Sequence, residues 1–152
     1  MIYLQHSKEP RMKIGYTTGI FDMFHAGHLE ILQEARKRCD FLIVGVATDE
    51  LCEKLKNKTP VIPFKERFEI VKAIKYVDKV FAQHHTDRDL DFKKHHFDIM
   101  FKGDDWAKSP DRKNLENQMA QLGGGVKVVY LRRTRNFSSS KLRQVIENIT
   151  QE

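Results

Sequence analysis

The sequence predicts an α/β fold: a doubly wound, Rossmann-like five-stranded parallel sheet with helices on both faces. Two observations favour it. Along the 152 residues, short apolar or β-branched stretches alternate with amphipathic stretches of helical period. The run FLIVGVA at 41–47 is apolar throughout, which is typical of a strand that helices cover on both sides. Such a strand belongs to a parallel sheet.

Strands and helices are expected to follow each other in strict order. The strands are predicted at 12–18, 41–47, 77–82, 98–102 and 126–131. The helices are predicted at 26–38, in a short turn from Asp49, from about Pro63 to Ile74, at 86–95, at 112–122 and from about Ser138. Gly123, Gly124 and Gly125 are interpreted as a turn that ends the fifth helix. A lysine-rich connection from Lys54 to Pro63 is expected to be a mobile loop.

Size and composition predict one cytoplasmic domain that acts on a small anion. The longest strongly apolar run, at 41–47, is too short to cross a bilayer, and the N-terminus has no features of a signal peptide. The net charge of +6 is spread along the chain, so we expect a nucleoside triphosphate as ligand and no nucleic acid. Cys39 and Cys52 are interpreted as small packing residues.

Three unusual clusters follow predicted strands. GIFDMFHAGH (19–28) follows the first, GDDW (103–106) the fourth and RRTRNFSSS (132–140) the fifth. Since ligands of such folds bind beyond the carboxyl ends of the strands, the clusters are expected to meet in one crevice. The chain has neither a P-loop pattern nor a G-x-G-x-x-G fingerprint, so a P-loop kinase and a dinucleotide dehydrogenase have no support.

His25 and His28 leave three interpretations open. They stand three apart around Gly27 at a strand-to-helix junction, where free N–H groups and the helix dipole favour an anion. They could instead be buried structural residues, or share a zinc ion, although no third ligand of convincing spacing accompanies them. The neighbouring Asp22 could cap the turn or lie near phosphates. The pairs His84–His85 and His95–His96 are interpreted as surface histidines, because adjacent side chains point apart.

The cluster RRTRNFSSS predicts a second anion site at a helix start. Hydroxyls and unpaired amides at Ser138, Ser139 and Ser140 can cradle phosphates, and Arg133 can clamp them. A plain helix cap needs only one serine.

The motifs GIFDMFHAGH, GDDW and RTRNFSSSK, in this order, resemble those of the cytidylyltransferase family within the H-x-G-H nucleotidyltransferases. The likeness is greatest to the bacterial glycerol-3-phosphate cytidylyltransferases and runs from about Met12 to the end. It divides the chain into an N-terminal extension, 1–11, and a nucleotidyltransferase domain, 12–152. The last motif departs from the family pattern, since Asn136 and Phe137 replace glycine and isoleucine and serines replace threonines. The hydroxyls remain.

The resemblance implies transfer of a cytidylyl group from CTP to a small phosphorylated alcohol, with release of pyrophosphate and formation of a CDP-linked precursor for cell-surface polymer or lipid synthesis. It implies Mg²⁺ held mainly by the triphosphate, no metal site of the protein itself, and a homodimer. The implied catalytic residues are His25, His28 and Arg133. The implied nucleotide ligands are Gly19, Ile20, Phe21, Asp22, Gly27, His28, Asp104, Thr134, Ser138 and Ser139, and the implied acceptor ligands are Lys56, Arg67 and Trp106.

Two other functions stay open at this point. One is an adenylyltransferase of the same superfamily, since the H-x-G-H pattern is shared; GDDW together with YVDKV favours cytidine. The other is a non-catalytic module that binds nucleotides or nucleic acid. Glycerol 3-phosphate is the first expectation for the acceptor, and phosphocholine, phosphoethanolamine or a polyol phosphate would suit much of the same machinery.

Overall fold

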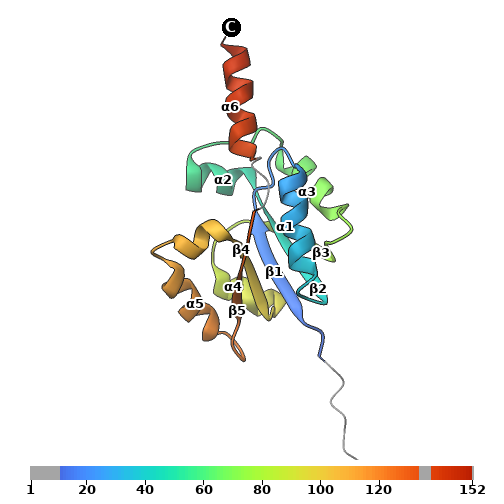
Figure 1. The fold of residues 1–152 in the computed structure, drawn as a ribbon, viewed down its shortest axis with the longest axis vertical. Coiled ribbons are helices and arrows are strands. Elements are labelled where there is room, and N and C mark those ends of the chain that lie inside the picture. Colours follow the sequence, from blue (N-terminus) through green and yellow to red (C-terminus); the bar gives the residue numbers. More distant parts are fainter. Residues whose placement is uncertain (1–10, 134–137, 152) are drawn as a thin grey trace, which may run out of the picture.

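The computed structural model describes residues 11–133 and 138–151 (Figure 1). The predicted extension therefore lies almost wholly outside the described residues, as does Thr134. The predicted fold is confirmed: one five-stranded sheet has the order β3-β2-β1-β4-β5, and every pair of neighbouring strands is parallel. The strands are β1 (Ile14–Gly19), β2 (Phe41–Ala47), β3 (Lys79–Gln83), β4 (Ile99–Gly103) and β5 (Lys127–Leu131).

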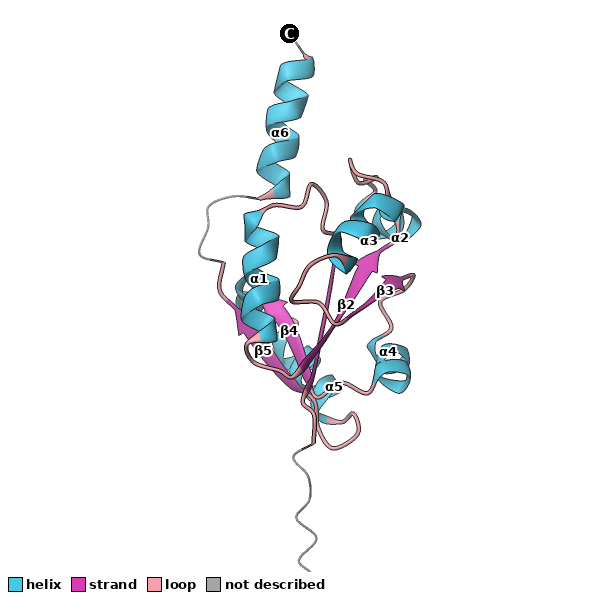
Figure 2. Cartoon of the chain, turned by 90° about the vertical axis from the view of Figure 1, so that its right-hand side faces the viewer, coloured by secondary structure: helices cyan, strands magenta, loops and turns pink. Residues whose placement is uncertain are grey.

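Helices cover both faces of this sheet (Figures 1 and 2). They are α1 (Ala26–Arg36), α2 (Asp49–Lys56), α3 (Phe64–Lys72), α4 (Arg88–His95), α5 (Arg112–Ala120) and α6 (Ser139–Thr150), with a 3₁₀ turn, η1 (Asp104–Lys108), after β4. In the larger core cluster Leu32 of α1 and Val71 of α3 join Val44 of β2; in the second, Leu115 and Met119 of α5 join Met100 of β4.

Strand periodicity divides the core between the two faces. Ile99 and Phe101 of β4 belong to the first cluster, whereas Met100 between them belongs to the second. Successive side chains of a strand point to opposite faces, so a strand with three buried residues in a row supplies both cores. This is why the apolar run at 41–47 became the buried strand β2.

The structure corrects the predicted loop between 54 and 63. Helix α2 continues to Lys56 and ends at Asn57, which has φ of 52° in the left-handed region. Asparagine tolerates this conformation better than most residues, so the connection begins at Asn57. Pro63 is the N-cap of α3. The glycine turn is confirmed, since Gly123 and Gly125 have positive φ of 52° and 98°.

The prediction of four surface histidines is wrong for His95. His84, His85 and His96 are exposed, but His95 is only 6% exposed and its ring lies 4.4 Å from that of Phe81. Asp91, one turn earlier on α4, is buried too, so this side of the helix faces the sheet. Paired histidines gave no sign of which member would point inward.

Helix α6 extends beyond the carboxyl end of the sheet, away from the other helices (Figure 1). Its first turn lies near the end of β1, because the Ser139 Oγ donates a hydrogen bond to the Asp22 carbonyl oxygen at 2.6 Å. Within the described part of the chain, no helix is both long and apolar enough to span a bilayer.

Candidate active site

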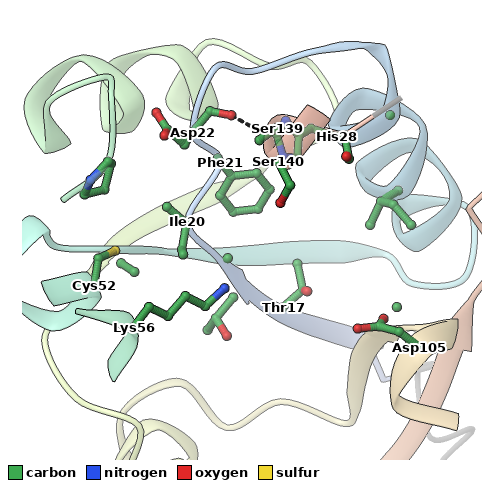
Figure 3. A pocket seen from close by; sticks show the side chains of 18 of the residues that line it. Thr17, Ile20, Phe21, Asp22, His28, Cys52, Lys56, Asp105, Ser139 and Ser140 are labelled. Atoms are coloured by element: carbon green, nitrogen blue, oxygen red, sulfur yellow. Dashed lines mark hydrogen bonds between the residues drawn. The ribbon is translucent and has the colours of Figure 1, made fainter. Parts of the chain in front are cut away.

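A cavity of about 990 Å³ opens at the carboxyl end of the sheet (Figure 3). It brings together the three predicted clusters, which confirms that independent strand ends converge there. The implied site residues that line it are Gly19, Ile20, Phe21, Asp22, His25, Gly27, His28, Lys56, Trp106, Arg133, Ser138 and Ser139. Asp104 and Arg67 are not among the lining residues.

The two histidines are held by the first turn of α1. His25 is the N-cap, and its Nδ1 accepts a hydrogen bond from the Gly27 N–H at 3.0 Å. The His28 Nδ1 accepts from the His25 N–H at 3.2 Å, and the two rings stack with centroids 4.0 Å apart. This is a reciprocal capping box made of imidazoles. Because each Nδ1 accepts from the backbone, a neutral ring must carry its proton on Nε2.

Both imidazoles are poised to be neutral in the free protein. The pKa of His28 is lowered to about 4, mainly by burial and then by the nearby His25 and Arg133, while Asp22 acts in the opposite direction. Burial, followed by Arg133, also lowers the pKa of His25. A bound anion would oppose these effects and favour the protonated form. The pair can therefore donate hydrogen bonds through Nε2 where an anion enters.

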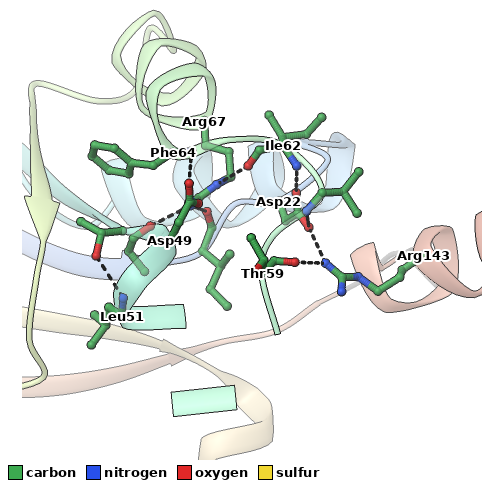
Figure 4. A network of polar contacts seen from close by, with 12 residues as sticks. Asp22, Asp49, Leu51, Thr59, Ile62, Phe64, Arg67 and Arg143 are labelled. Atoms are coloured by element: carbon green, nitrogen blue, oxygen red, sulfur yellow. Dashed lines mark hydrogen bonds and ion pairs between the residues drawn. The ribbon is translucent and has the colours of Figure 1, made fainter. Parts of the chain in front are cut away.

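Asp22 joins three segments around the cavity (Figure 4). Its carboxylate accepts hydrogen bonds from the N–H groups of Val61 and Ile62, both at 2.9 Å, and pairs with Arg143 of α6 at 3.3 Å. Arg143 also donates to the Thr59 carbonyl oxygen at 2.9 Å. The carboxylate of Asp22 is thus engaged in holding the 57–63 connection and α6 beside the site.

The start of α6 supplies donors to the cavity. Ser138 is its N-cap and accepts from the Lys141 N–H at 3.2 Å. Ser138, Ser139 and Ser140 all line the cavity, as does Arg133, which ends the described segment after β5. The Ser138 hydroxyl caps the helix and the Ser139 hydroxyl donates to the Asp22 carbonyl oxygen. The helix terminus and the Ser140 side chain are the groups that this segment offers to an anion.

Arg67 has a different role from the one expected. Its side chain has no exposed surface, and its guanidinium donates to three carbonyl oxygens, those of Ile20 at 2.6 Å, Ala47 at 2.8 Å and Ile62 at 2.8 Å. A fourth bond, of 2.7 Å, joins it to Asp49 (Figure 4). These contacts occupy the guanidinium. The structure therefore corrects the interpretation of Arg67 as an acceptor-phosphate ligand: it is a structural arginine.

The GDDW segment places Asp105, and not Asp104, at the cavity. An added Cβ at Gly103 would lie 2.5 Å from the Asp105 Oδ1 and 3.9 Å from the Arg133 Nε. Glycine therefore lets this carboxylate fold back toward the loop after β5. Asp104, the residue expected at the nucleotide, does not line the cavity, and its role stays a prediction.

The lysines after β2 divide between two surfaces. Lys56, the last residue of α2, and Lys58 line the cavity, whereas Lys54 does not. In Figure 3 the Lys56 side chain extends toward Thr17 at the end of β1. Lys54 is exposed on the same helix, so it offers a natural control for Lys56.

Sequence reasoning missed three cations of the cavity wall, Lys102, Arg88 and Arg143. Arg143 had a usable signal, because it lies one turn beyond Ser139 and Ser140 on the same helix face. Lys102 directly precedes GDDW, and strand periodicity would have placed it opposite its neighbours. Nothing in the sequence marked Arg88, at the start of a polar helix.

Among residues 11–133 and 138–151, no group of three or more His, Cys, Asp or Glu could hold a metal ion.

Comparison with known proteins identifies the family. The family model described as cytidylyltransferase-like matches residues 16–145, which include both histidines, Asp105 and the start of α6. The chain belongs to the cytidylyltransferase-like family.

Named relatives of this cytidylyltransferase-like chain differ in their products. It is 35% identical over 137 residues to the FAD synthase of Pyrococcus horikoshii, covering 88% of this chain and 89% of that protein. It is 32% identical over 139 residues to the glycerol-3-phosphate cytidylyltransferase of Bacillus subtilis, covering 91% and 100%. A solved structure, the lipopolysaccharide core biosynthesis protein of Thermoplasma volcanium, superposes with a TM-score of 0.70 at 28% identity and covers 84% of this chain and 100% of that one.

Replacing Arg67 tests its structural role. We expect Arg67→Met to lower the free energy of unfolding by about 3 kcal/mol or more, because it leaves buried carbonyl oxygens without a donor and Asp49 without its partner. Urea denaturation measures the change. Arg38→Met is the control, since the ion pair of Arg38 with Glu34 lies on the surface, where solvent screens it and its contribution to stability is small. If Arg67→Met left the stability unchanged and raised the KM for the acceptor, Arg67 would be a ligand of the acceptor phosphate after all.

The pKa of His28 gives a second test. In the free cytidylyltransferase-like protein we expect its imidazole to titrate near pH 4, and we expect bound CTP to raise the midpoint, because negative phosphates stabilise the imidazolium. NMR titration, with the signal assigned by its loss in His28→Asn, measures both midpoints. Cytidine, which lacks phosphates, should leave the midpoint unchanged. A midpoint near 6.5 in the free protein would show that the ring is solvated.

Proposed function

We propose that this chain is a cytidylyltransferase that transfers a cytidylyl group from CTP to a small phosphorylated alcohol, glycerol 3-phosphate or a related phosphomonoester. Pyrophosphate leaves, and the product is a CDP-linked precursor for cell-surface polymer or lipid synthesis. One observation carries the proposal: two imidazoles at the start of α1, whose Nδ1 atoms accept backbone hydrogen bonds, share a cavity with Arg133 and the serine-rich start of α6.

The reaction needs alignment more than it needs a base. A phosphate oxygen of the acceptor attacks the α-phosphorus of CTP, and the bond from that phosphorus to the bridging oxygen breaks, so its electron pair leaves with pyrophosphate. The acceptor phosphate is already ionised at neutral pH and gives up no proton. The protein therefore has to align the two phosphates and stabilise the charge that develops on oxygens.

Each group in the cavity suits one part of this task. Nε2–H groups of His25 and His28 donate to the α-phosphoryl oxygens, and Gly27 admits a close approach of the backbone. Arg133 and the start of α6 bind the β- and γ-phosphates, where the departing charge collects. Lys56 and Lys58 stand beside the same cavity and offset the repulsion between two anionic substrates.

Magnesium is part of the proposal as a companion of the triphosphate. Asp105 is an exposed carboxylate at the cavity, and a hard oxygen donor beside phosphates fits Mg²⁺, which keeps several waters and binds through one or two carboxylates. When bound, the ion would neutralise phosphate charge.

A second candidate is adenylyl transfer from ATP to a phosphorylated acceptor. The similarity to the FAD synthase of Pyrococcus horikoshii, at 35% identity over most of both chains, favours it, since the name of that relative specifies an adenine-containing product. Similarity to two glycerol-3-phosphate cytidylyltransferases, over 94% and 100% of their lengths, together with the GDDW and YVDKV segments, favours CTP. A non-catalytic binding module would have no need of the histidine pair.

Release of pyrophosphate tests the function directly. The protein is assayed with Mg²⁺ and either CTP or ATP against a panel of phosphomonoesters, with glycerol 3-phosphate as the first member. We expect pyrophosphate and a CDP-linked product with CTP. A product with ATP alone would replace the first candidate by the second, and no turnover with either nucleotide would leave only a binding module.

Two substitutions at His28 separate catalysis from helix capping. His28→Asn keeps an acceptor for the His25 N–H but removes Nε2, so we expect kcat to fall by about a hundredfold or more while CTP still binds. His28→Gln places a donor nearer the Nε2 position and should retain more activity. Steady-state kinetics and calorimetric binding of CTP provide the comparison. Near-normal turnover of His28→Asn would remove the histidine mechanism.

Lys56 and Lys54 form a matched pair on one helix. If Lys56 guides the acceptor phosphate, Lys56→Ala should raise the acceptor KM about fivefold or more, because an exposed charge-assisted contact contributes about 1 kcal/mol. Lys54→Ala, outside the cavity, should leave it unchanged. Both are assayed at saturating CTP with varied acceptor. Equal profiles for the two variants would mean that the end of α2 plays no part in acceptor binding.

A further inference from the structure

Lys102 is a half-buried cation in the wall of the cavity. It is the fourth residue of β4, and its Nζ lies 4.6 Å from the centre of the Trp106 ring. In the described ranges, 11–133 and 138–151, no hydrogen bond or ion pair reaches this ammonium group. Withdrawing an ammonium from water is costly unless it is paired. Contact with an indole face offsets part of that cost, and an incoming anion would offset more.

Arg88, the first residue of α4, faces the same indole. Its Cζ lies 5.9 Å from the centre of the Trp106 ring, and it also lines the cavity. Its contact with the Gln118 Oε1, at 3.5 Å, is long. The pKa of Lys102 is lowered to about 8, mainly by burial and then by Arg88, while Asp105 acts in the opposite direction. Two cations with one carboxylate leave this wall positively charged.

This positive centre is distinct from the one at the histidines. Besides burial, the groups that act on the pKa of His28 are His25, Arg133 and Asp22. Those that act on Lys102 are Arg88 and Asp105. The two sets share no residue. His25 caps α1 and His28 lies in its first turn, whereas Lys102 stands on β4 and Arg88 at the start of α4, so different elements supply the two groups of cations that line the cavity.

We propose that Lys102 and Arg88 form a second anion subsite against Trp106, and that it binds an acidic group of the acceptor other than the phosphate that reacts. The inference rests on the proposed function, in which the histidines bind the α-phosphate of the nucleotide, Arg133 and α6 bind its other phosphates, and Lys56 guides the reacting phosphate of the acceptor. An anion at Lys102 is then a third group. The preferred acceptor is a phosphomonoester that carries a further carboxylate or phosphate, to which the guanidinium can donate in bidentate fashion.

A matched pair of acceptors tests the subsite. Glycerol 3-phosphate and 3-phosphoglycerate differ only in a hydroxymethyl group and a carboxylate. We expect the wild-type kcat/KM to be about tenfold or more higher for 3-phosphoglycerate, as one charge-assisted contact provides. Lys102→Met keeps an unbranched apolar side chain of nearly the same length but removes the ammonium group and its charge. It should abolish most of that preference and leave the KM for CTP unchanged. Lys108→Met, an exposed lysine outside the cavity, is the control.

Three kinetic results would overturn the subsite. The first is an equal wild-type kcat/KM for the two acceptors. The second is an equal loss of kcat/KM with both acceptors in Lys102→Met, which would assign the lysine to the reacting phosphate. The third is a raised KM for CTP in Lys102→Met, which would assign the lysine to the nucleotide.

Failure of the proposed function can be told apart from failure of the subsite, because calorimetry measures binding of the acceptors without nucleotide and needs no turnover. There 3-phosphoglycerate should bind the wild type more tightly than glycerol 3-phosphate does, and Lys102→Met should remove the difference. Equal affinities of the wild type for the two would reject the subsite even where no acceptor reacts.

Discussion

The buried guanidinium of Arg67 is the constraint on which the site depends. It donates hydrogen bonds to the carbonyl oxygens of Ile20, Ala47 and Ile62. One side chain therefore holds together the segment after β1, the end of β2 and the segment before α3. A buried cation is tolerated only when such partners surround it. Strand ends of a parallel sheet leave carbonyl groups without partners, and Arg67 satisfies them where water is excluded. The turn that carries His25 starts from this fixed point.

Asp22 connects the segments on both sides of the cavity, where the two substrates are proposed to bind. Its carboxylate holds Val61 and Ile62 in the connection after α2, while its carbonyl oxygen and its ion pair hold Ser139 and Arg143 at the start of α6. The wall that carries Lys58 and the helix start proposed for the triphosphate are therefore tied to one residue between them. A shift of α6 on binding one anion would move the segment that faces the other, which gives a physical route for ordered binding.

Much of the fold was readable from the sequence because it rests on local signals. The apolar run of β2 and the helical stripe of α3 predicted elements within a few residues, and the position of three clusters after strands predicted the crevice. Single side chains were less readable. Arg67 carries the same charge whether it binds a phosphate or three carbonyl oxygens, and only burial decides between these roles. Likewise, GDDW contains two adjacent aspartates within the turn η1, and the sequence alone does not say which carboxylate lines the cavity, where the structure places Asp105.

The free cavity avoids accumulating positive charge at the place where the chemistry is proposed. Arg133 already acts on both imidazoles, and two imidazolium rings stacked 4.0 Å apart would repel each other and the arginine. The backbone resolves this conflict by occupying each Nδ1, so that the rings remain neutral donors through Nε2. The negative charge of a triphosphate compensates the arginine and lies where both Nε2–H groups can donate. These fixed donors stabilise the negative charge that develops on the phosphoryl oxygens, and an electrostatic contribution that is greatest in the transition state lowers the barrier.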